Sequence, residues 1–165
     1  MRIRSIEELL VASRLFADLS EDNLATIAGC ATIAHFADGE YIFREGEGAD
    51  TFYVLRSGTV ALETHVPGRG PARLMTLHDD DVLGWSWLFP PYRWHLDARA
   101  LGPVRALGFD AACLRQKSVE DHELGYELMR RFAKVIVSRL QATRMQLLDV
   151  YHHAEIIRAG VIPGD

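Results

Sequence analysis

The three tryptophans of the chain lie within one short segment, and their spacing is the clearest chemical signal in the sequence. Trp85, Trp87 and Trp94 span ten residues, although aromatic side chains make up only 9% of the chain. A cluster of rings can form an apolar pocket for a flat ligand, with a few polar groups that orient it. Ser86 and Arg93 are polar side chains of this segment that could do so. The same rings could instead pack on one another and leave no pocket.

No other combination of residues forms a catalytic or metal-binding motif. The sequence has no nucleophile elbow, P-loop or dinucleotide-binding fingerprint. The seven histidines include no His-x-His pair of the kind that metal-binding barrels use, and the run Asp79-Asp80-Asp81 is most simply a turn. The sequence therefore predicts a protein that is not an enzyme, with no catalytic residues, no bound metal and no cofactor.

Charge and cysteine content narrow the class further. A chain of 165 residues is about one domain's worth, and a net charge of −5 argues against a protein that mainly binds a phosphate backbone. Cys30 and Cys113 are too few for a disulfide framework, which predicts two buried thiols in a reducing compartment. No segment reads as a signal peptide or a membrane-spanning helix. We therefore expect a cytoplasmic protein.

The spacing of apolar residues predicts helices at both ends of the chain and strands between them. Ser5 with Glu8 forms a capping box, and Ser20 begins a second helix. The middle of the chain has short β-rich runs separated by glycines about every ten residues, as in a sandwich or barrel. Within a single domain overall, the predicted parts are N-terminal helices over 1–34, a β-rich region over 35–110, C-terminal helices over 111–151 and a tail over 152–165.

The C-terminal helical pattern is longer than a compact domain of this size needs. Apolar residues recur in steps of three and four from Leu124 to Tyr151, with no proline between them. A helix of this length extends about 45 Å at 1.5 Å per residue. One part of the apolar stripe can pack within the chain and the rest against a second copy, which predicts a homodimer. The predicted interface residues are Phe132, Ile136, Leu140, Thr143, Leu147 and Tyr151.

The order of these elements resembles the cyclic nucleotide-binding domain of the CRP/FNR regulators. The stretch from Phe36 to Gly58, FADGEYIFREGEGADTFYVLRSG, is similar to the first half of that domain. Asp81 to Gly84 is similar to the approach to the family's phosphate-binding cassette, and Ser138 to Arg144, SRLQATR, to the dimer-helix segment that reaches the base. The resemblance, over residues 14–151, implies an α+β, mainly β fold. That fold is a double-stranded β-helix jelly roll, flanked by N-terminal helices and a long C-terminal dimerisation helix.

The cassette, residues 82–97, departs from the family where the family holds its nucleotide. The resemblance implies a glutamate for the ribose hydroxyl after Gly84, but the chain has Trp85. It implies an arginine for the cyclic phosphate where the chain has Trp94, with Arg93 one residue early. A shift of one residue on an extended segment turns a side chain to the opposite face, so whether Arg93 faces the pocket stays open. Backbone amides that begin at Trp85 could still attract an anion. The candidate pocket residues are Gly84, Trp85, Ser86, Trp87, Arg93, Trp94, Thr143 and Arg144.

Together these features predict a non-catalytic regulatory or sensory domain with a modified, tryptophan-rich ligand pocket that disfavours cyclic nucleotides. One alternative is a transcriptional regulator of the CRP/FNR type that responds to a cyclic nucleotide and needs a partner to bind DNA, because only 14 residues follow Tyr151. Another is a structural dimerisation module with a dead pocket. The expected partners are a small-molecule ligand, a second copy of the chain and an unknown protein, but neither DNA directly nor a membrane.

Overall fold

The computed structural model describes residues 5–158, and this part of the chain begins with two capped helices. The first, α1, is Ile6–Val11, and the second, α2, is Glu21–Ala28. The Ser5 hydroxyl accepts a hydrogen bond from the Glu8 amide at 3.2 Å, and the Glu8 carboxylate accepts one from the Ser5 amide. Ser20 caps α2 through its own side-chain oxygen. The predicted capping box and both N-terminal helices are therefore confirmed.

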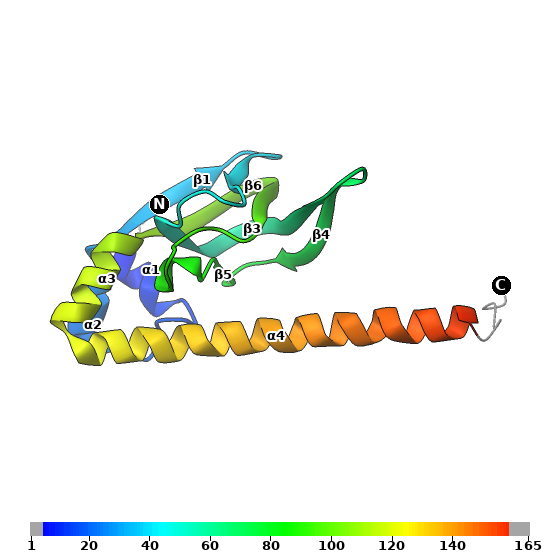
Figure 1. Ribbon diagram of the computed structural model, residues 1–165. Coiled ribbons are helices and arrows are strands. Elements are labelled where there is room, and N and C mark those ends of the chain that lie inside the picture. Colours follow the sequence, from blue (N-terminus) through cyan, green and yellow to red (C-terminus); the bar gives the residue numbers. More distant parts are fainter. Residues whose placement is uncertain (1–4, 159–165) are drawn as a thin grey trace. The chain divides into compact units, whose positions relative to one another are not determined.

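Six antiparallel strands form one sheet after these helices (Figure 1). They are β1 (Ala31–Phe36), β2 (Tyr41–Phe43), β3 (Thr51–Val66), β4 (Gly70–Leu77), β5 (Val82–Leu83) and β6 (Asp97–Asp110). The sheet order is β1-β6-β3-β4, and the short strands β2 and β5 pair with β6 and β3. An antiparallel sheet with flanking helices is the α+β, mainly β class that the sequence predicts.

The two central strands are longer than the short runs that the glycines predict. Runs expected on either side of Gly58 form the single strand β3, and those on either side of Gly102 form β6. Gly58 has a φ of +103° and Gly102 a φ of +90°. The pairing of β3 with β6 shifts its register on both sides of Ser57, so the chain bends at the glycine without leaving the sheet. Glycine here marks an irregularity within a strand and not a turn.

Two helices close the described chain, and their bounds differ from the predicted ones. α3 is Ala111–Glu120 and α4 is His122–Arg158. α4 thus continues into the predicted tail, of which residues 159–165 lie outside the described residues. The chain divides into two compact units, with the boundary between Glu127 and Leu128. Within residues 5–158, no helix combines the length and the apolarity that a membrane span needs.

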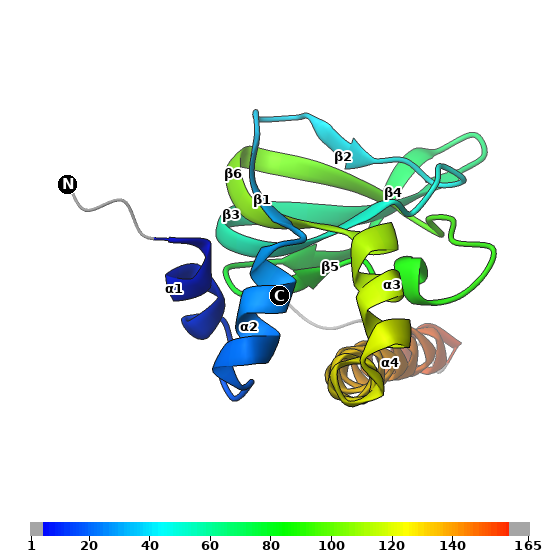
Figure 2. The ribbon, with the colours of Figure 1, turned by 90° about the vertical axis from the view of Figure 1, so that its left-hand side faces the viewer.

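The core of the first unit contains a row of stacked rings that ends in the cassette. Phe52 of β3 stacks on Phe109 of β6 with ring centroids 4.7 Å apart, and Phe109 packs against Phe16 at 5.3 Å. Phe52 also stacks on Trp87 at 4.7 Å. Helices α1, α2 and α3 gather at one end of the sheet (Figure 2). Trp87 of the cassette therefore packs directly on the aromatic core of the unit.

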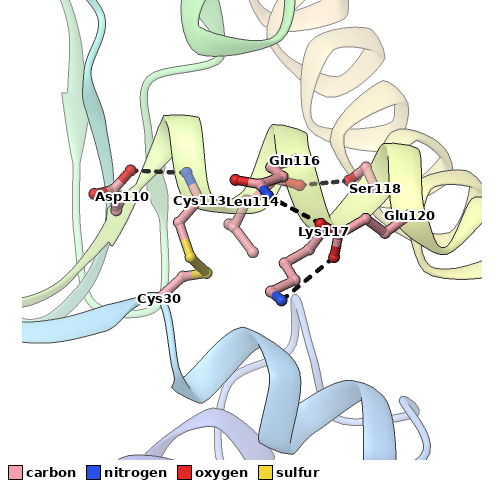
Figure 3. Close-up of a disulfide and its surroundings, with 8 residues drawn as sticks. All are labelled: Cys30, Asp110, Cys113, Leu114, Gln116, Lys117, Ser118 and Glu120. Carbon is pink, nitrogen blue, oxygen red and sulfur yellow. Dashed lines mark hydrogen bonds and ion pairs between the residues drawn. A yellow bond between two sulfur atoms is a disulfide. The ribbon is translucent and has the colours of Figure 1, made fainter.

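The two cysteines form a disulfide, so the prediction of two separate thiols is wrong. Cys30 lies between α2 and β1, Cys113 lies in the first turn of α3, and their Cα atoms are 5.8 Å apart (Figure 3). The bond links two parts of the first unit that are 83 residues apart in sequence. Counting cysteines did not reveal it, because only the folded sheet brings these two positions together.

Gly125 marks a close approach between the start of α4 and the end of α3. A Cβ atom on Gly125 would lie 2.8 Å from the backbone oxygen of Ser118. Alanine in a helix normally gains about 1 kcal/mol over glycine, but an overpacked contact with backbone costs about 1–3 kcal/mol. We expect Gly125→Ala to lower the free energy of unfolding in urea by up to about 2 kcal/mol, because the clash with the backbone outweighs the gain in propensity.

Gly29→Ala is the matched control for this prediction. Gly29 ends α2 with a φ of −64°, and its Cβ would meet the Thr26 carbonyl at an ordinary 3.4 Å. This variant should be as stable as the wild type or more stable by about 0.5 kcal/mol. Equal urea midpoints for the two variants would show that α3 and α4 are not in close contact at Gly125.

Candidate ligand-binding cassette

Near the start of the cassette lies a glycine, Gly84, that both its backbone conformation and the available space require. β5 ends at Leu83, and Gly84 has a φ of +98°, in the left-handed region. A Cβ atom on Gly84 would lie only 2.5 Å from two ring carbons of Trp94, Cη2 and Cζ3. The indole therefore lies directly against the main chain of Gly84.

Trp94 is the residue that occupies the interior of the cassette. Its side chain is 5% exposed, and its ring stacks on Phe43 of β2 with centroids 3.9 Å apart and planes 9° from parallel. The indole thus contacts Phe43 as well as the backbone of Gly84. It carries one hydrogen-bond donor, no acceptor and no charge. The position at which the resemblance implies an arginine for the phosphate is filled by an apolar ring.

Trp87 belongs to the core, while Trp85 lies at the cassette surface. Trp87 is 1% exposed and stacks on Phe52. Trp85 is half-buried and meets His95 edge-on, with ring centroids 5.9 Å apart. Of the three tryptophans, only Trp85 retains a sizeable exposed surface that a ligand could contact without rearrangement of the core.

A short 3₁₀ helix, η1 (Ser86–Leu88), follows Gly84 and Trp85. It is one turn long, its first residue has no side-chain cap, and Ser86 is itself buried. A single turn carries little of the aligned dipole that makes a longer helix N-terminus attractive to anions. The sequence-based expectation of an anion site at the amides of Trp85 and Ser86 therefore finds no further support in the structure.

The side chain of Arg93 does not enter the interior of the cassette but supports a neighbouring turn. Its side chain is exposed, and its Nη1 donates a hydrogen bond to the Gly46 carbonyl at 2.7 Å. The main chain joins the same turn, because the Trp94 amide donates to Glu47 and the Ala49 amide donates to Tyr92. These hydrogen bonds hold the end of the cassette against residues 44–49. Arg93 and Trp94 extend to different surroundings, as a shift of one residue on an extended segment requires.

A buried group of charged side chains on the sheet, which the sequence analysis missed, also binds the 44–49 segment. Glu63 and Asp97 are register partners on β3 and β6, so their carboxylates lie on the same face of the sheet. Glu63 is 2% exposed and accepts two hydrogen bonds from Arg99, at 2.6 and 3.1 Å. These bonds and the charge of Glu63 raise the pKa of Arg99. Asp97 accepts a hydrogen bond from the Glu45 amide at 2.7 Å and so fixes the 44–49 segment to β6. The sequence signal that could have revealed this group is the carboxylate of Glu63, which lies where the alternation along the strand predicts an inward-facing side chain.

No metal site forms around these carboxylates. Among residues 5–158, no group of three or more His, Cys, Asp or Glu side chains is placed to hold a metal ion. The two oxygens of Glu63 instead bind the Arg99 guanidinium in a fork, which uses them for structure.

Arg115 is a second cassette contact that the sequence analysis missed. From α3, its Nη1 donates a 2.7 Å hydrogen bond to the Trp87 carbonyl, and its guanidinium lies 4.2 Å from the centroid of the Tyr92 ring. Tyr92 has a φ of +53°, which is unusual for a bulky residue. Nothing in the local sequence distinguishes Arg115 from other arginines on an amphipathic helix, so only the fold reveals its role.

The remaining predicted site residues lie on the second unit. Thr143 and Arg144 are exposed on α4, as are Leu140, Leu147 and Tyr151. Phe132, which the sequence places in a dimer interface, is fully buried. The structure brings Gly84, Trp85, Ser86, Trp87 and Trp94 together in the cassette and directs the Arg93 side chain to the Gly46 carbonyl, whereas Thr143 and Arg144 belong to the second unit.

Comparison with known proteins decides the family. The family model described as the cyclic nucleotide-binding domain matches residues 33–121, which include the whole cassette. The chain belongs to the cyclic nucleotide-binding domain family. Domains of this family are regulatory and non-catalytic. The resemblance inferred from the sequence is thereby confirmed.

Relatives of this cyclic nucleotide-binding domain include a transcriptional regulator and two solved structures. The CRP-like cAMP-activated global transcriptional regulator of Mycobacterium tuberculosis is 26% identical over 145 residues, which are 88% of this chain but 63% of the regulator. A candidate cyclic nucleotide-binding protein from Geobacter metallireducens GS-15 is 32% identical, with a TM-score of 0.74 over 84% of this chain and 99% of that one. The N-terminal domain of a Streptomyces coelicolor A3(2) transcriptional regulator is 25% identical, with a TM-score of 0.65 over 81% and 94%. These structures confirm the predicted jelly-roll fold.

Proposed function

We propose that this chain is a non-catalytic regulatory or sensory domain whose cassette does not select a cyclic nucleotide. The observation that supports this most directly is the placement of Trp94, buried against Phe43 and the Gly84 backbone. The family resemblance implies an arginine at that position, and the indole has no charge to offer a phosphate. Trp85 likewise stands where a glutamate would accept the ribose hydroxyl, and an indole cannot accept that bond.

Arg93 is a poor substitute for the missing arginine. Its guanidinium is committed to the Gly46 carbonyl, and its side chain is exposed beside the cassette. A cyclic phosphate in the cassette would then depend mainly on backbone amides. Desolvating an anion without a paired cation is costly, so the cassette should reject the nucleotide and not merely bind it more weakly.

The cassette can serve a regulator in two ways. If Trp94 moves away from Gly84, the space beside Phe43 and the half-buried Trp85 suits a flat, apolar ligand. If Trp94 stays, the cassette is a filled pocket and the chain is a structural dimerisation module. The close stacking of Trp94 on Phe43 favours this second candidate as the state of the cassette without ligand.

We also propose that α4 forms a homodimer. Apolar and small polar side chains occur along it in steps of three and four, and several are open to solvent, with Leu140 68% exposed. An exposed apolar stripe of this length is a liability for a monomer and suits a second helix of the same kind. Phe132 is not exposed, so the proposed dimer face consists of the predicted interface residues that follow it, Ile136, Leu140, Thr143, Leu147 and Tyr151.

Native mass spectrometry together with light scattering tests both proposals on the full chain. At micromolar concentration the mass should be about twice 18.5 kDa, with either no ligand or a ligand that is not a cyclic nucleotide. Leu140→Glu or Leu147→Glu should reduce the mass to that of one chain, because each places a charge in the middle of the apolar face.

Gln141→Glu is the control, because it adds the same charge at an exposed position beside the face. It should leave the dimer mass unchanged. A wild-type monomer, or a dimer that survives both leucine variants, would overturn the proposed interface. A co-purified cyclic nucleotide would overturn the proposed cassette function.

A further inference from the structure

Helix α3 connects the disulfide to the cassette within the first unit. Cys113 lies in its first turn and is bonded to Cys30, at the junction of α2 and β1. Two residues later, Arg115 donates to the Trp87 carbonyl and lies over the Tyr92 ring. One helix turn therefore carries both a covalent link to the N-terminal part of the unit and the polar contact with the cassette.

The backbone holds the two cysteines together independently of the bond between their sulfur atoms. The Asp110 amide donates to the Cys30 carbonyl at 2.9 Å, and the Asp110 carboxylate accepts from the Cys113 amide at 2.9 Å (Figure 3). Reduction would therefore leave the two thiols side by side and ready to close again. Cys30 is 5% exposed, whereas Cys113 is half-buried, which makes Cys113 the more accessible of the two residues for attack by a small thiol.

We propose that Cys30 and Cys113 form a reversible thiol–disulfide switch that acts on the cassette through Arg115. The inference rests on the proposed function only in taking the cassette as the regulated part of the domain. It does not require that the cassette bind any particular ligand. The redox partner is a low-molecular-weight thiol of the glutathione class, which exchanges with accessible protein disulfides.

The exchange balances with two molecules of glutathione. The thiolate of the first attacks Sγ of Cys113, the bond between the cysteines breaks, and Cys30 leaves as a thiolate that takes up a proton. The second thiolate attacks the glutathione sulfur of the mixed disulfide and releases Cys113, which also takes up a proton. The protein gains two electrons and two protons, and glutathione disulfide forms. The reverse sequence closes the bond again.

The effect reaches the cassette because α3 loses a restraint on reduction. In the oxidised chain the disulfide holds the first turn of α3, and Arg115 holds Trp87 and the strained Tyr92 from the same helix. The positive φ of Tyr92 persists only while its surroundings hold it. The hydrogen bonds at Asp110 keep the reduced thiols close to one another, but they restrain α3 less than a covalent bond does. The contacts of Arg115 therefore weaken on reduction, and the cassette loosens.

Tryptophan emission is a direct readout, because all three tryptophans lie in the cassette. The full chain is equilibrated with excess glutathione disulfide or excess reduced glutathione, and alkylation followed by mass measurement counts its free thiols. We expect complete interconversion between no free thiols and two. On reduction the emission should shift to the red, and its protection from acrylamide quenching should decrease.

Two variants separate the switch from a purely structural crosslink. Arg115→Met keeps an unbranched apolar stem but removes the guanidinium and with it the contacts with the Trp87 carbonyl and the Tyr92 ring. The thiols of this variant should still interconvert, while the emission shift is lost. Direct quenching by the disulfide would persist in this variant and is thereby distinguished. Cys113→Ser should give the emission of the reduced wild type in both buffers.

Three results would overturn the switch. They are a disulfide that stays closed in excess reduced glutathione, an emission that is identical in both redox states, and an Arg115→Met variant that keeps the full shift. Each of these leaves the proposed discrimination against cyclic nucleotides standing, because that proposal depends on Trp85 and Trp94 and not on the cysteines.

Discussion

Replacing Trp94 with alanine is expected to lower the free energy of unfolding by about 3–5 kcal/mol. The side chain is almost completely buried, stacks on Phe43 and rests on the backbone of Gly84. Its removal loses apolar burial and a stacked ring pair, and the neighbouring backbone cannot close the cavity, because β2 and β6 are paired at Phe43. Urea unfolding followed by far-ultraviolet circular dichroism measures the loss without relying on tryptophan emission.

Trp85→Ala is the matched control for this experiment. It removes the same side chain from the same segment, but Trp85 is only half-buried and meets His95 edge-on. The expected loss is smaller than for Trp94→Ala, about 1–3 kcal/mol, because Trp85 keeps part of its surface in solvent. If the two variants lost equal stability, Trp94 would not be the packed centre of the cassette, and the proposed reason for its role would be wrong.

The elements of the fold are predictable where their signals are local. The capping box at Ser5 depends on residues three apart, and the strand at Tyr41–Phe43 is bounded by turn residues. The glycines at 58 and 102 were misread, because a positive φ is needed in a turn and in a bulge alike. Only the pairing partner distinguishes the two cases, and a single sequence does not contain it.

Contacts between distant segments are the part that the sequence did not predict. The disulfide joins positions 83 residues apart, and Arg115 reaches a carbonyl 28 residues earlier in the chain. Neither a cysteine nor an arginine has a local sequence pattern that predicts which distant residue it will contact. By contrast, the replacement of a charged pair by Trp85 and Trp94 was visible at once, since it is a change of residue type at positions that the family resemblance specifies.

The wild-type chain is expected to show no saturable binding of cAMP or cGMP below about 100 μM, which corresponds to about −5.5 kcal/mol. Each charge-assisted hydrogen bond to a nucleotide contributes about 1.5–3 kcal/mol, and the cassette lacks two of them. Their loss alone weakens binding by about two to four orders of magnitude. Trp94 adds a further obstacle, because its ring must leave Phe43 and Gly84 before a ligand can enter.

The double variant Trp85→Glu/Trp94→Arg should reverse this result, because it restores the carboxylate for the ribose hydroxyl and the cation for the phosphate. Trp85→Ala/Trp94→Ala is its control, since it opens the same space without supplying either group. Isothermal titration calorimetry should detect binding in the Glu/Arg variant and none in the Ala/Ala variant. The affinity of the Ala/Ala variant is expected to be weaker by about 100-fold or more. If the wild type saturates at low micromolar nucleotide and the Glu/Arg variant binds no better, Trp85 and Trp94 do not occupy the family's two positions. Arg93 would then be the residue to replace next, because its bond to the Gly46 carbonyl is the contact it would have to exchange for the phosphate.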